Sequence, residues 1–529
     1  MQKVLAILGG FFLSALSGCI VLYHLDAYDD PAANASTGGA GGLGGAGGAG
    51  GEGGQGGGTC RVEWCHTMDP EASPCAVACP SFESKRIEAA SDQDVRGIAV
   101  GLDTGDERIY VTGRYRSTLM IGGVSVTSES GPGDDDAYVA AFDPILGGVN
   151  VKGLHEVDAQ GTKLDAFPRI GFDVAHGAGK QVIVGGWYSK DGHGLNAFVR
   201  AYSSDLATAS WTRTLGGIGT DGVVAVATHE TKVFALGFLG SGEMMPGENS
   251  VPCAAGSTLV PAGESHMFLI AFDSGGTCQW VKHFSGGVHE PKAMAVNGSG
   301  DIFITGTYKN ELDGTEKNPP PPTNMGGAPS MFVMKLGSED GNVAWVRSHG
   351  GGSDAANPRG IAATVGESVL VTGSMTGAVD FGRGTIVADK KSPFVVSILD
   401  GQTTHWSTAI TSADSTATGD SEGINVVPNG IGGALISGTY ARDIDFDPKN
   451  PGPDVEDPLQ GAFLARFDDA GQLQWFQNLG GGEAPQERWL RLAVGQSGIY
   501  MGAGWTPAFL FEEQTAQTGL DIVIAKITP

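Results

Sequence analysis

Residues 462–475 read AFLARFDDAGQLQW: two short apolar runs on either side of an Asp-Asp-Ala-Gly stretch. A closely similar stretch, FLIAFDSGGTCQW, fills residues 268–280. Runs of four to seven apolar, β-branched or aromatic residues bounded by Asp and Gly are typical of β-strands. Asp and Gly in the middle favour a tight turn. Each stretch therefore predicts two antiparallel strands, the second of which carries a tryptophan.

The same pattern recurs along the chain, so internal repeats decide the fold. The first of the two runs has seven copies: AYVAAF (137–142), AFVRAY (197–202), MFLIAF (267–272), MFVMKL (331–336), PFVVSI (393–398), AFLARF (462–467) and IVIAKI (522–527). A second element precedes it and ends at Gly113, Gly186, Gly237, Gly306, Gly373, Gly438 and Ala503. A third element resembles RGIAV at Arg96, and the fourth centres on Trp211, Trp280, Trp345, Trp406 or Trp475.

Four short strands per unit of about 64 residues, seven times over, predict an all-β, seven-bladed β-propeller with four-stranded blades. The last unit ends at Pro529 with three strands. Residues 81–88, SFESKRIE, precede the first unit and are expected to supply the missing outer strand of the last blade. That closure would remove an exposed sheet edge.

The repeat units resemble the bacterial SBBP-type β-propeller family. The resemblance rests on RGIAV followed by IYVTG, on GAVDFG at 377–382, on DAYVAAFD at 136–143 and on the two stretches quoted above. It covers about residues 82–529 and implies the propeller fold. It carries no specific activity, because a fold hosts many functions.

The N-terminus resembles an export signal. An apolar run follows Lys3, and Leu16-Ser17-Gly18-Cys19 resembles the bacterial lipobox. The resemblance implies a lipoprotein signal peptide at 1–18, a lipid on Cys19 and, from Ile20, sorting to the outer membrane. An uncleaved apolar anchor is the alternative. With the repeats, this terminus resembles exported surface lipoproteins of myxobacteria.

Residues 19–58 form the predicted lipidated N-terminus and tether, because 15 of the 21 residues in 38–58 are glycine. Residues 59–80 are predicted to be a small Cys-rich module, and 81–529 the propeller. Export favours disulfides among Cys60, Cys65, Cys75, Cys79, Cys253 and Cys278, with Cys253–Cys278 the natural pair and the pairing of the other four open. Zinc at the four clustered cysteines is the alternative.

Ligand-binding candidates are few. The repeated tryptophans are expected to pack between blades, whereas Trp187 and Trp505 fall outside that register and are candidates for ligand contact. Asp443, Asp445 and Asp447 are weak calcium candidates, with solvated loop charge the alternative. No convincing catalytic constellation is found: the H-E-x-x-H motif, for example, does not occur. No cofactor is expected.

Composition narrows the function classes. The 529 residues carry 32 Lys and Arg against 59 Asp and Glu, a net charge of −27, which argues against nucleic-acid binding. We expect a lipid-anchored, non-catalytic binding scaffold for protein or polysaccharide. A propeller-type hydrolase or lyase acting on extracellular glycans is one alternative, and a structural component of a cell-envelope assembly is another.

Overall fold

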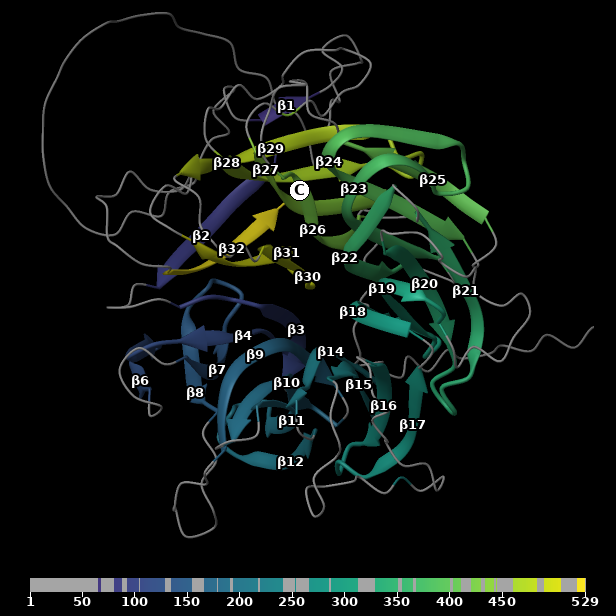
Figure 1. The fold of residues 1–529 in the computed structure, drawn as a ribbon. Helices are drawn as coiled ribbons and strands as arrows, with labels where there is room; N and C mark the ends of the chain where they lie inside the picture. The colour runs from purple at the N-terminus through teal and green to yellow at the C-terminus, as the bar shows by residue number, and fades with distance from the viewer. Residues whose placement is uncertain are drawn as a thin grey trace, which may run out of the picture.

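Seven antiparallel sheets are arranged in a ring in the computed structural model, which has no helix among the residues it describes (Figure 1). The described residues are 65–67 and 80–528, except for gaps at 88–92, 104, 129–134, 155–165, 178, 191–193, 217–218, 241–252, 254–265, 285–286, 313–328, 351–353, 365–367, 400–402, 411–419, 430–432, 442–443, 445–459, 483–489 and 506–520. The predicted seven-bladed β-propeller is confirmed.

Each of blades 1 to 3 pairs its four strands in chain order, from the innermost strand outward. Blade 1 contains β3 (Gly97–Asp103), β4 (Asp106–Tyr115), β7 (Asp136–Phe142) and β8 (Gly148–Gly153); blade 2 contains β9 (Ala166–Gly177), β10 (Gln181–Lys190), β11 (Gly194–Ser203) and β12 (Ala209–Leu215); blade 3 contains β14 (Gly222–His229), β15 (Lys232–Leu239), β16 (His266–Asp273) and β17 (Cys278–Phe284).

Blades 4 to 6 repeat this order. Blade 4 contains β18 (Gly287–Val296), β19 (Ile302–Asn310), β20 (Ser330–Leu336) and β21 (Val343–His349); blade 5 contains β22 (Ala355–Ala363), β23 (Val369–Asp380), β24 (Thr385–Leu399) and β25 (Thr403–Ala409); blade 6 contains β26 (Glu422–Asn429), β27 (Gly433–Ala441), β28 (Gln460–Phe467) and β29 (Leu473–Gly482).

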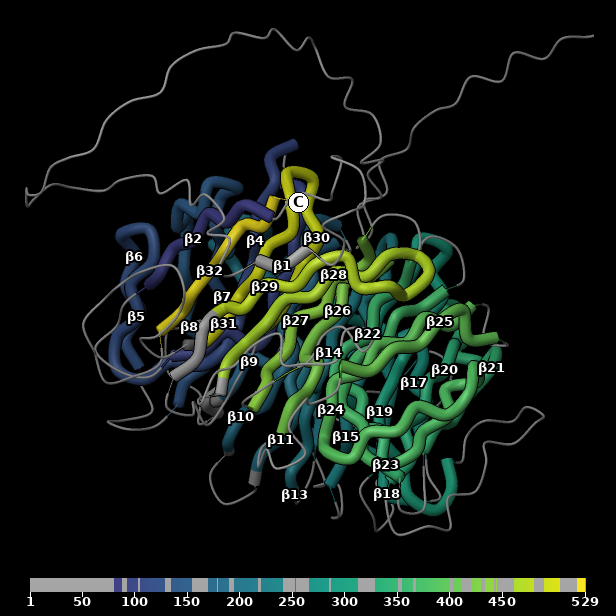
Figure 2. The backbone as a smooth tube through the Cα atoms, turned by 90° about the horizontal axis from the view of Figure 1, so that it is seen from above, coloured from purple at the N-terminus to yellow at the C-terminus, as the bar shows by residue number. Residues whose placement is uncertain are grey.

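Blade 7 joins the two ends of the propeller sequence, as predicted. It contains β30 (Leu490–Val494), β31 (Ile499–Trp505) and β32 (Asp521–Thr528), and its outer strand is β2 (Ser81–Ile87). β2 pairs with β32 from Ser81↔Thr528 to Ile87↔Ile522, and both views show the purple and yellow strands side by side (Figures 1 and 2). The Arg86 guanidinium Nε donates to Asp521 Oδ2 at 2.8 Å across this pair.

Three short additions extend the blades. β5 (Thr118–Ile121) and β6 (Val124–Thr127) form a hairpin in blade 1, and β13 (Gly219–Thr220) pairs in parallel with β11. β1 (Cys65–Thr67), from the predicted Cys-rich module, pairs with the outer strand β29 of blade 6. The module's Cys65 therefore lies, by its backbone, at the edge of the propeller.

The core lies between blades, because each sheet buries both faces against its neighbours. Ile522 and Ile524 of blade 7 pack in one cluster with Ile109 and Val111 of blade 1, and all four are fully buried or nearly so. Alternate side chains of a strand point to opposite faces. The strands therefore read as almost continuous apolar runs rather than alternating ones.

The repeated tryptophans pack between blades, as predicted, and three of them, Trp211, Trp280 and Trp406, meet a turn glycine of the next blade. Trp211 Nε1 donates to the Ser274 carbonyl at 2.9 Å, and a Cβ added to Gly276 would lie 2.6 Å from the Trp211 ring. A Cβ added to Gly341 would likewise lie 2.6 Å from the Trp280 ring, and one added to Gly471 would lie 2.6 Å from the Trp406 ring. These glycines have φ of 77°, 67° and 73°, which glycine adopts without the cost that a Cβ brings. The turn glycine and the tryptophan of the preceding blade therefore pack directly against each other.

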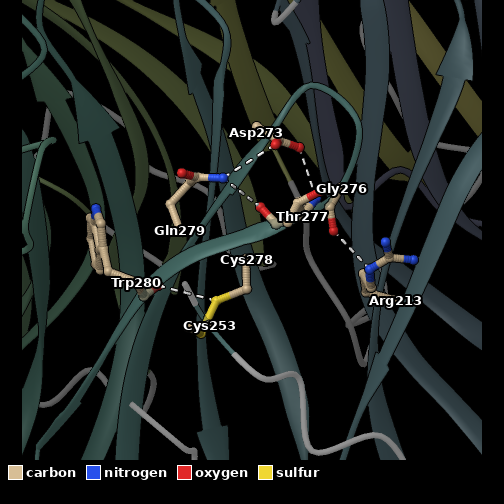
Figure 3. Close-up of a disulfide and its surroundings, with 8 residues drawn as sticks. All are labelled: Arg213, Cys253, Asp273, Gly276, Thr277, Cys278, Gln279 and Trp280. Carbon is tan, nitrogen blue, oxygen red and sulfur yellow. Dashed lines mark hydrogen bonds between the residues drawn. A yellow bond between two sulfur atoms is a disulfide. The ribbon is translucent and has the colours of Figure 1, made fainter. Parts of the chain in front are cut away.

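The Cys253–Cys278 disulfide is present (Figure 3). Cys278 begins β17, and Cys253 lies in the long connection between β15 and β16. Both side chains are buried, 6% and 1% exposed. The bridge therefore fixes one point of that connection to the outer strand of blade 3.

Candidate functional site: charged residues around the propeller axis

The innermost strands of blades 2 to 6 share a β-bulge opposite the glycine that ends the repeated second element. One residue is skipped between Gly171 and Asp173, and likewise at the equivalent point in the other four blades. The skipped residues are Phe172, Val224, Lys292, Arg359 and Ile424. Bulges re-aim side chains and are frequent beside functional sites. In blade 1, Arg96 precedes Gly97 as Arg359 precedes Gly360, so the same position carries a cation in blades 1, 4 and 5.

Charged side chains from non-adjacent blades interact across the middle of the ring. Burial lowers the pKa of Arg491 in blade 7 to about 10. The negative charge of Asp173 in blade 2 raises this pKa, whereas the positive charges of Arg359 in blade 5 and Arg96 in blade 1 lower it further. Blades 7 and 5 are not neighbours, nor are blades 7 and 2. The electrostatic influence of these charges on Arg491 therefore acts across the axis, around which Figure 1 places the innermost strands β3, β14, β18, β22, β26 and β30.

Burial also raises the pKa of Asp173 to about 6, against the lowering effect of the Val226 N–H and of Arg491. The Asp173 side chain is half-buried. A carboxylate with a pKa near 6 changes charge within the ordinary range of environmental pH. Its protonation would remove the negative charge that faces Arg491.

Polar side chains of the innermost strands form hydrogen bonds to the backbone of the next blade. Asp173 Oδ2 accepts from the Val226 N–H of the next blade at 2.9 Å, and Asn425 Oδ1 accepts from the Leu492 N–H at 3.2 Å. Arg491 Nε donates to the Arg96 carbonyl at 2.8 Å and so joins blade 7 to blade 1. Asp173, Asn425 and Arg491 occupy equivalent positions. Each lies opposite the residue that precedes the last residue of the repeated second element, which is Gly186, Gly438 or Ala503. These hydrogen bonds therefore fix the innermost strands relative to one another.

Ion pairs surround this centre. Lys292 Nζ lies 2.9 Å from Glu290 Oε2, and Glu422 Oε2 lies 3.4 Å from Arg359 Nη2 and 3.3 Å from Lys391 Nζ. In blade 1 the fully buried Asp94 pairs with Arg96 at 3.1 Å and with Arg114 at 3.0 Å. We name Arg96, Asp173, Lys292, Arg359 and Arg491 the axial cluster.

The axial cluster offers guanidinium and ammonium groups to an anion. Arginine presents a planar fork of donors that matches a carboxylate or a phosphate. Within the residues that the structure describes, no group of three or more His, Cys, Asp or Glu side chains is placed to hold a metal ion.

Three histidines come together between blades 3 and 4. His266 in β16 lies 5.1 Å from His283 in β17 and 6.5 Å from His289 in β18, ring centre to ring centre. His283 lies in β17 and His289 in β18.

The predicted ligand-contact tryptophans fall in the second strands of blades 2 and 7. Trp187 is half-buried, stacks on Phe172 at 4.9 Å and meets Phe238 edge-on at 5.9 Å. Trp505 ends β31, and its side chain lies outside the described residues. Ligand contact by either stays a prediction, although Trp187 stacks on a bulge residue next to Asp173.

The remaining predicted site residues lie outside the described part of the chain: Cys19, Cys60, Cys75, Cys79, Asp443, Asp445, Asp447 and the side chain of Cys65. No helix among the described residues is long and apolar enough to cross a membrane.

Sequence reasoning missed the axial cluster. The first strands read GIAV, AMAV, GIAA, GINV and RLAV, which are apolar with small residues and by themselves favour a scaffold. The signal was the residue just before the apolar run: Arg96, Lys292 and Arg359 hold a cation at that point in three units. Asp173 and Arg491 gave no signal of this kind.

Comparison with known proteins gives neither a family nor a function for this chain. No protein-family model matches the chain, and no curated protein sequence matches it. A DUF4221 family member from Bacteroides vulgatus is similar in structure, with a TM-score of 0.38 and 8% identity over 88% of this chain and 99% of that one.

Enzymes are among the similar structures as well. A quinohemoprotein alcohol dehydrogenase from Comamonas testosteroni has a TM-score of 0.38 and 8% identity over 83% of this chain and 76% of its own. The phage phi92 endosialidase has a TM-score of 0.37 and 8% identity over 84% and 69%. At these identities and scores the likenesses carry no functional argument, and the chain is a seven-bladed β-propeller whose distant structural neighbours include both enzymes and a protein of a family of unknown function.

Proposed function

We propose that this protein is an exported lipoprotein, anchored to the outer membrane or cell surface through Cys19, whose propeller is a non-catalytic binding scaffold for protein or polysaccharide. The observation that carries the proposal is the axial cluster on its interlocked backbone. A rigid ring that presents unlike charges at its centre is suited to recognition, because no ordering of the site is needed on binding. The SBBP-like repeats, the lipobox and the tether support export and display.

The Cys253–Cys278 bridge supports the same location. Disulfides persist in oxidising compartments and are rare in the cytosol. The low Lys and Arg content supports a partner other than nucleic acid.

Anchoring is tested with Cys19→Ser in the producing organism, using metabolic labelling with an alkyne fatty acid and membrane fractionation. We expect wild type to carry the label and to sediment with outer membranes, and the variant to lose both. Cys253→Ser serves as the control, since it removes a cysteine without touching the lipobox. A labelled, membrane-bound Cys19→Ser variant would contradict the anchor.

Binding is tested with the purified full chain on a glycan array and by cross-linked pull-down from intact cells. We expect a saturable ligand that is recovered unchanged after incubation. A ligand that is cleaved would instead favour the hydrolase or lyase alternative. No ligand in either assay, together with stoichiometric recovery in an envelope complex, would favour the structural alternative.

A further inference from the structure

We propose that His266, His283 and His289, at the interface between blades 3 and 4, make this interface open locally in mildly acidic solution. We name these three residues the histidine cluster. Neutral imidazoles are compatible with a closed interface, whereas protonated ones place like charges inside it. The inference goes beyond the binding function proposed above and does not depend on it. It rests on the geometry of the three rings, on their burial and on what the other blades carry at the same positions.

The three rings converge from three strands of two blades. His266 begins β16, His283 precedes the last residue of β17, and His289 lies near the start of β18. The His266 ring centre is 5.1 Å from that of His283 and 6.5 Å from that of His289. At such separations, one protonated ring disfavours protonation of the others. Because β17 belongs to blade 3 and β18 to blade 4, this repulsion acts across the interface.

The cluster is buried beside the apolar core that joins the two blades. His266 is 4% exposed and His289 is fully buried, and Phe284 and Leu312 of the core cluster adjoin them in sequence and in space. The Nε2 of His289 donates to the Glu311 carbonyl at 2.8 Å. Because a carbonyl oxygen only accepts, neutral His289 carries its proton on Nε2. A second proton would therefore place a full charge in this buried position.

His283 is half-buried, and its Nε2 is a buried atom that has no hydrogen-bond partner among the described residues. Burial lowers the pKa of His283, and the charges of His266 and His289 lower it further. Every cause that acts on His283 therefore opposes its protonation while the interface is closed.

The other titratable groups near the cluster are already engaged or lie on other faces. Adjacent residues of a strand point to opposite faces, so Lys282 and Glu290 point away from His283 and His289. Glu290 is moreover paired with Lys292 at 2.9 Å. Asp221, before β14, accepts from the Gly240 N–H at 2.8 Å. The remaining titratable groups on the surrounding strands are Tyr308, which lies opposite His289 and bonds to Ser348, Lys309, Glu311, Arg347 and His349.

The fold does not require histidine at these positions. The residue equivalent to His266 is Asp136, Asn196, Ser330, Ser392, Gly461 or Asp521 in the other blades. The residue equivalent to His283 is Gly153, Thr214, Ser348, Ala409 or Asn478 in the blades with the same pairing. None of these side chains has an ordinary pKa between 5 and 7. The interface between blades 3 and 4 therefore differs from the equivalent interfaces in the response to acid that its side chains allow.

Linkage gives the direction and size of the effect. A histidine that is neutral in the closed interface and titrates normally, near pH 6.5, in the opened one stabilises closure above that pH and loses this contribution as the pH falls. Between pH 7.5 and 5.5, each such histidine raises the opening equilibrium constant about 10-fold. Two or three of them together raise it by about 100-fold or more.

The test is hydrogen exchange of the detergent-solubilised full chain at pH 7.5 and 5.5, corrected for the intrinsic exchange rate and read by mass spectrometry. We expect residues 266–270 and 281–290 to open at least about 10-fold more often at pH 5.5. The internal reference is β27 in blade 6, because the chain has no histidine after His405; its opening should change far less. The triple variant His266→Gln, His283→Gln, His289→Gln should respond to pH as β27 does.

Two single variants complete the design. His283→Gln replaces a half-buried side chain and should reduce the acid response of 281–290 by about 10-fold; it gives the same test should the triple variant not fold. His229→Gln is the matched control, since His229 also bonds across blades 3 and 4, to the Gly298 carbonyl at 3.3 Å, but lies outside the cluster. Its acid response should equal that of wild type. An equal response of wild type and His283→Gln, or a response of β27 as large as that of 281–290, overturns the inference.

Discussion

The contact between Trp406 and Gly471 gives the sharpest test of how the blades interlock. Gly471 has φ of 73°, and a Cβ placed on it would lie 2.6 Å from two atoms of the Trp406 ring. Gly471→Ala therefore brings two costs. An alanine in this left-handed conformation loses about 1 kcal/mol of stability. Displacing the packed indole ring costs about 1–3 kcal/mol more.

Gly123→Ala is the matched control. Gly123 has φ of 79°, and a Cβ there would meet nothing within 4 Å. We expect Gly123→Ala to lower the free energy of unfolding by about 1 kcal/mol and Gly471→Ala by about 2–4 kcal/mol. Urea unfolding monitored by circular dichroism measures both.

A double-mutant cycle isolates the steric part. In a Trp406→Ala background, Gly471→Ala should cost no more than Gly123→Ala does, because the ring that it displaces is gone. Equal losses for the two glycine variants in the wild-type background would refute the interlock.

Three further predictions concern closure, the disulfide and pH. Deleting Asp521–Pro529 removes Ile522, Ile524 and Ile527, each at most 1% exposed. Losing their burial costs about 1.5–3 kcal/mol for each side chain, which together approaches the whole stability of a domain. Cooperative melting should therefore vanish, and unchanged melting by calorimetry would contradict the closure. Cys278→Ala should lower the free energy of unfolding by about 3 kcal/mol, since the bridge spans a sequence separation of 25; equal denaturation midpoints with and without reductant would argue against this. Burial lowers the pKa of His349 to about 4. The free energy of unfolding that depends on neutral His349 is therefore fully present above about pH 6.5 and falls by about 3 kcal/mol toward pH 4. His349→Gln should flatten that part of the pH–stability profile, and an unchanged slope would refute this prediction.

Prediction from the sequence succeeded where a single unit carries its own signal. Stretches such as 462–475 encode two strands and their turn locally, and seven copies fix the number of blades. Even the long-range pairing of 81–87 with 522–528 could be deduced, because the count of strands left one strand missing and one unassigned. Cys253 and Cys278 could be paired because they stand apart from the other cysteines in the sequence.

The axial cluster could not be found in this way. Asp173, Arg359 and Arg491 are far apart in the chain and belong to blades 2, 5 and 7. Each stands singly in a mainly apolar strand, so the sequence of one unit does not indicate which charges come together. Apolar patterning reports which face of a strand is buried, whereas it says nothing of which side chains meet across a ring.

By itself, then, the amino-acid sequence determined the strands, the turns, the seven units and the way in which the ring closes, because these depend on local propensity and on a period repeated along the chain. Only the tertiary structure decided what lies at the centre. Charges hundreds of residues apart meet there once all seven blades are in place, and burial in that ring moves the pKa of Asp173 to about 6.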